Sequence, residues 1–298
     1  MTYPFLDRLR VIESSAFIAA PLAGLTLAQF GAQVIRIDMI GGGIDYARLP
    51  RMPQSGRSLY WTALNKGKRS VAIDLRQPQG RELVQALATA PGANAGVLLT
   101  NIGTPWLAHD VLAQRRPDVI SCTIQGNADG STAVDYTVNC ATGYPAVTGG
   151  GSAQHPVNHV LPAWDIACAY QAAFAIVAAV NRRQRSGEGA ELKLALSDMA
   201  FSMLSHLGLL PEAQLLGQDR PSIGGPATAA MAAALERALA VREQVPHRRA
   251  HRESDLCRHG PLAKRATGAE HGAKRLALTP ARRAAEHMIL HAGAGRGR

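Results

Sequence analysis

The sequence contains few cysteines, and they do not fall into a recognisable pattern. Cys122, Cys140, Cys168 and Cys257 are the only four, and no two have the two-residue spacing of a CxxC metal or redox motif. A disulfide framework and a structural zinc site are therefore not predicted, and the composition favours a reducing compartment. We expect a cytoplasmic protein that binds no metal.

Long apolar runs and an N-terminal leader pattern are also missing. No uninterrupted apolar stretch reaches the roughly 18 residues that a membrane span needs. The first ten residues, MTYPFLDRLR, carry charges where a signal peptide needs an apolar core. We therefore expect neither membrane insertion nor secretion.

The C-terminal quarter lacks aromatic residues altogether. Residues 225–298 contain none of the Phe, Trp and Tyr of the chain, and they carry 14 Lys and Arg against 6 Asp and Glu. Such a segment has too little apolar surface to bury a core. We interpret 1–224 as the folded domain and 225–298 as a basic tail rich in Ala, Arg, Gly and His, disordered or partly helical. The tail holds most of the net charge of +10, so we expect no nucleic-acid binding by the nearly neutral folded part.

Two kinds of apolar segment alternate along residues 10–126. Short runs rich in β-branched residues, typical of buried strands, are followed by amphipathic stretches that begin after Pro or end at Gly. This alternation predicts the α/β class, with a Rossmann-like parallel sheet covered by helices on both faces. The expected strands are 10–14, 33–38, 70–75, 96–101 and 118–126, and the expected helices are 20–30 and the segments after Pro78 and Pro105.

Two phosphate-binding fingerprints are absent. The segment 14–24 has no GxGxxG, which leaves NAD binding a weak hypothesis, and the turn NKGKRS lacks the first glycine and the spacer of a Walker loop. The turn nevertheless places Lys66, Lys68 and Arg69 directly before a strand, and Arg76 follows that strand. These cations indicate either a solvated turn or a site for phosphates.

One acid, Asp165, precedes an uncharged, Ala-rich stretch that extends to Asn181. The stretch predicts a buried helix with Asp165 near its N-terminus, where the carboxylate is either a helix cap or a nucleophile facing a cleft. No second acid and no Ser-His-Asp triad is visible beside it, so a carboxylate working alone fits covalent acyl chemistry best. His155 and His159 flank Pro156, which argues against a helical metal pair.

These stretches resemble the class III CoA-transferases, the family of formyl-CoA and carnitine CoA-transferases. The most specific elements are the turn NKGKRS before a strand and the single acid of LPAWDIACAYQAAFAIVAAVNRR, whose helix leads into GEGAELKLALSD. The resemblance covers essentially residues 5–224. It implies the large domain of that family and an enzyme whose substrate is a CoA thioester, without a separate cofactor.

By this resemblance Asp165 is the nucleophile that forms an aspartyl-CoA thioester. Met39 and His109 stand where the family often has basic residues, so phosphate recognition is expected to rely on the basic turn and on Arg76. The CoA-binding residues that the resemblance implies are Lys66, Lys68, Arg69, Ile73, Arg76, Asn101 and Ile102.

Three further stretches, GGGIDYARLP, DGSTAVDYTVNCATGYPAVTG and PVNHVLPAWD, look most like a family member that moves CoA between the two carboxyls of one mesaconate. We therefore expect an intramolecular CoA transfer. Transfer to a separate carboxylic acid is one alternative. The other is an inactive remnant that binds CoA at most, or a basic product whose tail associates with nucleic acid.

The tail does not resemble the family. The resemblance implies a small domain after the large one, and a return of the chain that closes an interlocked homodimer, but nothing in 225–298 matches either feature. A frameshift in a GC-rich coding sequence would produce this composition, and a genuine basic extension is the alternative. We expect the small domain to be missing.

Overall fold

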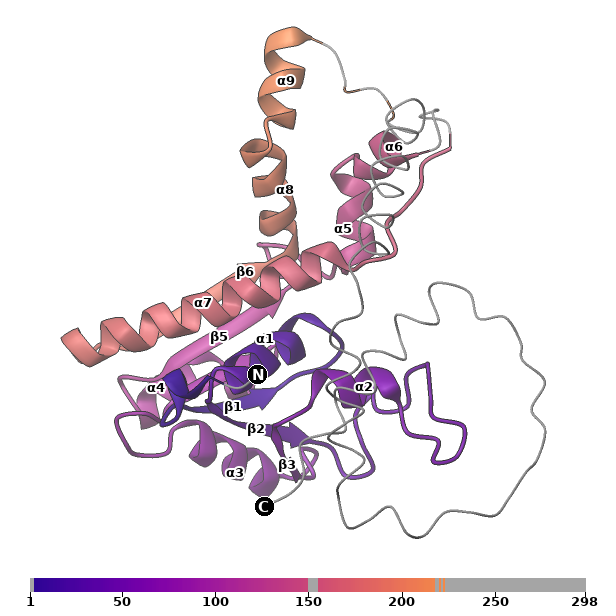
Figure 1. Ribbon diagram of the computed structural model, residues 1–298. Coiled ribbons are helices and arrows are strands. Elements are labelled where there is room, and N and C mark those ends of the chain that lie inside the picture. Colours follow the sequence, from indigo (N-terminus) through magenta and orange to yellow (C-terminus); the bar gives the residue numbers. More distant parts are fainter. Residues whose placement is uncertain (1–2, 150–154, 218–219, 221, 223–298) are drawn as a thin grey trace, which may run out of the picture. The chain divides into compact units, whose positions relative to one another are not determined.

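The computed structural model describes residues 3–149, 155–217, 220 and 222, and Figure 1 shows their arrangement. Six parallel strands form one sheet in the order β3-β2-β1-β4-β5-β6. The order reverses direction between β1 and β4, as in doubly wound dinucleotide-binding sheets, so the predicted α/β class and Rossmann-like sheet are confirmed. The strands are β1 (Arg10–Ser14), β2 (Gln33–Asp38), β3 (Arg69–Ala72), β4 (Val97–Thr100), β5 (Ile120–Gln125) and β6 (Ala190–Ala195).

The central strands bury side chains on both faces because helices cover both. Val11 packs in a core with α1 (Ala19–Gln29) and α7 (Ala163–Ser186), whereas its neighbour Ile12 packs on the other face with α3 (Pro78–Ala88) and α4 (His109–Arg115). Figure 1 shows α7 and α3 on opposite sides of the sheet. The other described helices are η1 (Pro4–Leu6), α2 (Leu59–Leu64), η2 (Pro105–Leu107), α5 (Asp135–Ala141), α6 (Tyr144–Thr148), α8 (Leu196–His206) and α9 (Leu209–Leu216).

The third strand is shorter than the predicted 70–75. It ends at Ala72, and the chain then turns, with the Gln77 N–H donating to the Asp74 carbonyl at 3.2 Å. The turn has a polar reason, since the Asp74 carboxylate accepts the Arg76 N–H. The run 70–75 therefore forms the end of strand β3 and the beginning of the turn that follows it.

Helix α7 begins at Ala163, so Asp165 lies in its first turn as predicted. Among the described helices it is the one long and apolar enough to cross a membrane, by length and composition only. Core helices of soluble proteins share that composition, and α7 buries Cys168, Ala172 and Ile176 against the sheet side of the domain.

The described residues all lie within the predicted folded domain, 1–224. The basic tail 225–298 lies outside them, and so do the expectations of a frameshift and of a missing small domain. These interpretations, and the boundary at 224, stay predictions.

Candidate active site

The backbone of Asp165 is held by a second acid, Asp135, the first residue of α5. The Asp135 Oδ2 atom accepts hydrogen bonds from the N–H groups of Trp164 (2.7 Å) and Asp165 (2.9 Å). These N–H groups have no partner within the helix, so Asp135 caps α7. The helix-cap interpretation of Asp165 is therefore wrong. Within the described residues, the Asp165 carboxylate itself accepts no hydrogen bond.

The surroundings of Asp165 favour its protonated form more than water does. Burial, and to a lesser extent the nearby charge of Asp135, raises the pKa of Asp165 from 3.8 to about 7, and Arg48 partly offsets the rise. A carboxylate with this pKa is more basic than an ordinary one and is still substantially ionised at neutral pH. It is therefore a suitable nucleophile without a general base.

Asp135 belongs to a polar cluster beneath the start of α7. Its side chain is buried, and its Oδ1 atom has no hydrogen bond within the described residues but lies 3.9 Å from His159 Nε2. The other ring nitrogen of His159 contacts the Leu161 carbonyl. The Trp164 indole donates to Asn139 on α5 at 3.1 Å. The cluster thus fixes α5, the loop before α7 and the first turn of α7 to one another.

A cation, Arg48, approaches the same site from the segment after β2. Its guanidinium carbon lies 4.5 Å from the centre of the Tyr60 ring and 5.6 Å from that of Phe17. Phe17 has a φ of 64°, a left-handed conformation that is unfavourable for a bulky residue. The Asp45 carboxylate holds it there by accepting the Phe17 N–H at 2.9 Å. The loop after β1 and the segment after β2 are therefore joined near Asp165.

A buried ionic network supports the loop after β1. Arg36 contacts Glu13 at 3.1 Å, and Lys68 contacts the same Glu13 oxygen at 2.8 Å. The Lys68 ammonium also donates to the Pro21 carbonyl (2.8 Å) and to Asn65 Oδ1 (2.9 Å). An ammonium has three protons, so Lys68 has none left for a phosphate. Lys68 thus has a structural role in this network, and its predicted CoA contact stays a prediction.

Asn101 uses both ends of its amide inside the protein. Its Oδ1 atom accepts the Ala16 N–H at 2.9 Å, and its Nδ2 atom donates to the Ala16 carbonyl at 2.7 Å. Its side chain therefore positions the loop after β1 and has one amide proton left, so its predicted CoA contact stays a prediction. The next residue, Ile102, is 42% exposed at the carboxyl end of β4, and its predicted CoA contact stays a prediction.

The remaining predicted CoA residues lie around the edge strand β3. Lys66 and Arg69 are exposed. Arg76 is exposed and forms a two-pronged pair with Asp74, with contacts of 2.8 and 3.1 Å. Ile73 is buried in the core on the α3 side of the sheet, so its side chain is not presented to solvent. Three solvent-accessible cations are thus left for a phosphate site.

The two buried cysteines of the described residues, Cys122 and Cys168, do not compete with Asp165 as nucleophiles, and the third, Cys140, is exposed on α5. Cys168 lies one turn after Asp165, but burial raises its pKa to about 12, and burial does the same for Cys122. Such thiols stay protonated at neutral pH and are poor nucleophiles. Residues 3–149 and 155–217 also contain no group of three or more His, Cys, Asp or Glu placed to hold a metal ion.

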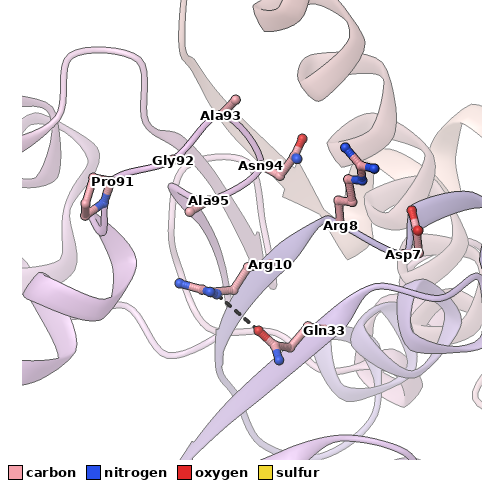
Figure 2. A pocket seen from close by; sticks show the side chains of 9 residues that line it. All are labelled: Asp7, Arg8, Arg10, Gln33, Pro91, Gly92, Ala93, Asn94 and Ala95. Carbon is pink, nitrogen blue, oxygen red and sulfur yellow. Dashed lines mark hydrogen bonds between the residues drawn. The ribbon is translucent and has the colours of Figure 1, made fainter.

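A cavity of about 430 Å³ lies at the other end of the sheet. Figure 2 shows it between the starts of β1 and β2, where Arg10 donates to Gln33 at 3.1 Å, and the loop 91–95 before β4. Ligands of open parallel sheets bind outside the carboxyl ends of the strands, and this cavity faces the amino ends. None of the residues predicted for catalysis or CoA binding lines it.

Sequence reasoning did not single out Asp135 or Arg48. Asp135 lies 30 residues before Asp165, and no motif spacing connects the two. An acid that opens a helix signals a cap only for its own helix. The quoted stretch GGGIDYARLP contained Arg48, but its polar sequence gives no sign that it folds against two aromatic rings.

Comparison with known proteins agrees with this geometry. A sequence profile of CoA-transferase family III matches residues 6–237. The 2-methylfumaryl-CoA isomerase of Chloroflexus aurantiacus is 49% identical over 220 residues, which cover 74% of this chain and 54% of that enzyme. The succinyl-CoA–D-citramalate CoA-transferase of the same organism is 30% identical over 235 residues, 74% of this chain and 55% of that enzyme.

A solved structure has the same fold. The crystal structure of a CaiB/BaiF family protein from Brucella suis superposes with a TM-score of 0.65 at 27% identity, covering 74% of this chain and 59% of that one. The chain spans about half the length of the curated relatives it matches. Sequence profile, relatives and fold agree that the chain belongs to CoA-transferase family III.

Proposed function

We propose that this chain carries the nucleophile of an intramolecular CoA transfer that converts 2-methylfumaryl-CoA (mesaconyl-C1-CoA) to 3-methylfumaryl-CoA (mesaconyl-C4-CoA). The observation that carries the proposal is the Asp165 carboxylate. It lies at the start of α7, has no hydrogen bond within the described residues and has a pKa of about 7. The similarity to the 2-methylfumaryl-CoA isomerase supports the choice of substrate.

The first half of the reaction moves CoA onto the protein. An Asp165 oxygen attacks the thioester carbonyl, the C–S bond breaks, and CoA leaves as the thiolate, which gives a mixed anhydride. The thiolate then attacks the aspartyl carbonyl and releases the mesaconate carboxylate. The product of this half is an aspartyl-CoA thioester.

The second half returns CoA to the other carboxyl of the same molecule. The C4 carboxylate attacks the aspartyl thioester and expels the thiolate, and the thiolate attacks the C4 carbonyl of the new anhydride. Asp165 leaves as a carboxylate, so no proton, oxidant or cofactor is consumed. Both intermediates hydrolyse readily, which makes exclusion of water a requirement of the site.

Several features remain predictions. The large-domain assignment of 1–224 and the interlocked homodimer rest on the resemblance. Because the chain spans about half of its curated relatives, the activity belongs to the proposal as well. The same is true of the CoA contacts of Lys66, Arg69, Arg76 and Ile102.

A product assay tests the proposal. The purified chain is incubated with mesaconyl-C1-CoA alone, and separately with added succinate, and the esters are resolved by chromatography. Formation of the C4 ester without an added acid supports the intramolecular reaction. Formation of succinyl-CoA, with no C4 ester in the first incubation, would instead establish transfer to a separate acid. Absence of any transfer by a chain that remains folded would contradict both.

The exposed cations around β3 should bind the phosphates of CoA. We expect the double variant Arg69→Ala/Arg76→Ala to weaken CoA binding by roughly tenfold or more for each lost charge-assisted contact. KM should rise more than kcat falls, because these contacts are alike in the ground and transition states. Calorimetric titration with CoA measures the effect.

The matched control lies on the opposite edge of the sheet. Arg185→Ala/Lys193→Ala also removes two exposed cations, one at the end of α7 and one on β6, and it should leave the affinity for CoA unchanged. Equal affinities in the two double variants would identify the basic turn as a solvated surface.

A further inference from the structure

Arg48 is a cation without an acceptor at the proposed active site. Its backbone N–H donates to the Asp45 carbonyl, but its guanidinium has no hydrogen bond or ion pair within the described residues and only contacts the faces of two rings. A guanidinium has five N–H donors in a rigid fork that matches a carboxylate. Within the described residues none of these N–H groups donates a hydrogen bond, so the donors of the fork are available to a ligand.

Several features hold this cation in place. Tyr60 and Phe17 contact it, and Asp45, which is 2% exposed, fixes the left-handed backbone of Phe17. Asp45 is in turn 3.8 Å from the buried Arg36. An unfavourable backbone conformation that is held by a buried acid indicates a position selected for function. The fold therefore fixes the Phe17 ring that Arg48 contacts, while Arg48 itself is exposed and accessible to a ligand.

The negative charges around Asp165 explain why a cation is needed at the position of Arg48. The ionisation of Asp165 responds to two neighbouring charges, the negative Asp135 and the positive Arg48. A substrate with a second carboxylate would bring another negative charge to a site that already holds two. Like charges held in one site repel, and a nearby cation with free donors offsets that repulsion.

We infer that the Arg48 guanidinium binds the free carboxylate of a dicarboxylic acyl-CoA, beside the thioester that Asp165 attacks. This inference rests on the proposed function and names the residue that selects substrates with a second carboxyl. The Tyr60 hydroxyl is buried without a hydrogen-bond partner in the described part of the chain, and it is a second donor to the same group. In an intramolecular transfer, the two carboxyls of one substrate would exchange places between Arg48 and Asp165.

A binding comparison tests the inference. Dissociation constants are measured by calorimetry for 2-methylfumaryl-CoA and for methacrylyl-CoA, which lacks the free carboxylate, in an Asp165→Asn background that prevents turnover. We expect a preference of roughly ten- to a hundredfold for the dicarboxylic ester. Arg48→Gln should abolish this preference and leave the affinity for methacrylyl-CoA unchanged.

Matched variants separate a carboxylate contact from a general charge effect. Arg57→Gln removes an exposed arginine from the same segment and should keep the full preference. Arg48→Lys, which keeps the charge and loses the fork, should keep only part of it. If Arg48→Gln weakens both esters equally, Arg48 acts on the site as a whole and the inference is overturned.

Free acids distinguish failure of the inference from failure of the proposed function. If neither ester binds, the CoA site is absent and the proposed function fails, and the same titrations are then made with 2-methylfumarate and methacrylate. Tighter binding of the diacid that is lost in Arg48→Gln supports the carboxylate site on its own. Equal binding of the two acids by the unchanged chain overturns it.

Discussion

Replacing Asp165 by alanine should lower kcat by roughly 10⁴- to 10⁶-fold in the mesaconyl-CoA assay, as expected for loss of a covalent nucleophile. The reason is that the proposed route passes through a bond to an Asp165 oxygen, which alanine cannot form. Hydroxylamine trapping should detect an acyl-enzyme in the unchanged chain and none in the variant. Retention of most of the activity would exclude Asp165 as the nucleophile.

The control is another aspartate in the first turn of a helix. Asp110 is exposed in the first turn of α4, so Asp110→Ala should leave kcat within about threefold, as for an ordinary surface substitution. Asp165→Asn addresses folding. Since burial raises the pKa of Asp165, the ionised carboxylate costs the native state free energy above the unfolded pKa. The Asn variant should therefore be at least as stable as the unchanged chain at pH 8, although it is inactive.

The same pKa sets the pH dependence of activity. The carboxylate attacks only when ionised, so kcat/KM should rise with pH through a midpoint near 7. Asp135→Asn removes a charge that raises this pKa and should move the midpoint to lower pH, whereas Arg48→Gln should move it to higher pH. An activity that does not change between about pH 5 and 8 would contradict the assignment.

Replacing Arg36 by methionine should lower the free energy of unfolding by about 3–5 kcal/mol, the cost of leaving buried charges without their partner. Arg36 is 2% exposed and donates to Glu13 (3.1 Å), Asp38 (2.8 Å) and the Ser15 carbonyl (2.9 Å). The methionine fills similar space but supplies no charge. Lys68 is then the only cation contacting Glu13 within the described residues.

Urea denaturation measures this loss, with Arg10→Met as the control. Arg10 is exposed at the start of β1 and donates a single side-chain hydrogen bond, to Gln33 at 3.1 Å. Its replacement should change the free energy of unfolding by less than about 1 kcal/mol, as is usual for surface polar contacts. Similar losses in the two variants would mean that the buried network contributes little more than a surface hydrogen bond.

Much of the fold could be predicted from the sequence because its signals are local. The run 96–101 is apolar, and its strand β4 (Val97–Thr100) is buried throughout. The uncharged, Ala-rich stretch after Asp165 is typical of a buried helix. The exception is the 70–75 run, which ends early as a strand because Asp74 forms a turn. A polar side chain that bonds to its own backbone neighbours overrides an apolar pattern.

The site was less predictable because its partners are far apart in the sequence. Lys68 stands in a polar turn and looks solvated, yet its partner Glu13 lies 55 residues earlier. Asp135 and Arg48 approach Asp165 only once α5 and the segment after β2 are in place. No spacing rule connects such residues, so a sequence can indicate Asp165 as a candidate nucleophile through its helix but cannot indicate the charges around it.

The two hydrogen bonds between Asn101 and Ala16 resemble one further pair of hydrogen bonds between neighbouring strands. The Asn101 amide presents an acceptor and a donor to one peptide unit, as a strand residue does, so it extends the pairing of β1 with β4 past the point where both strands end. Deamidation to aspartate would add almost no volume. It would nevertheless set a carboxylate oxygen against the Ala16 carbonyl, two acceptors facing each other. The shape of the loop after β1 therefore depends on the Nδ2 atom of Asn101, and hydrolysis of that amide would distort the loop.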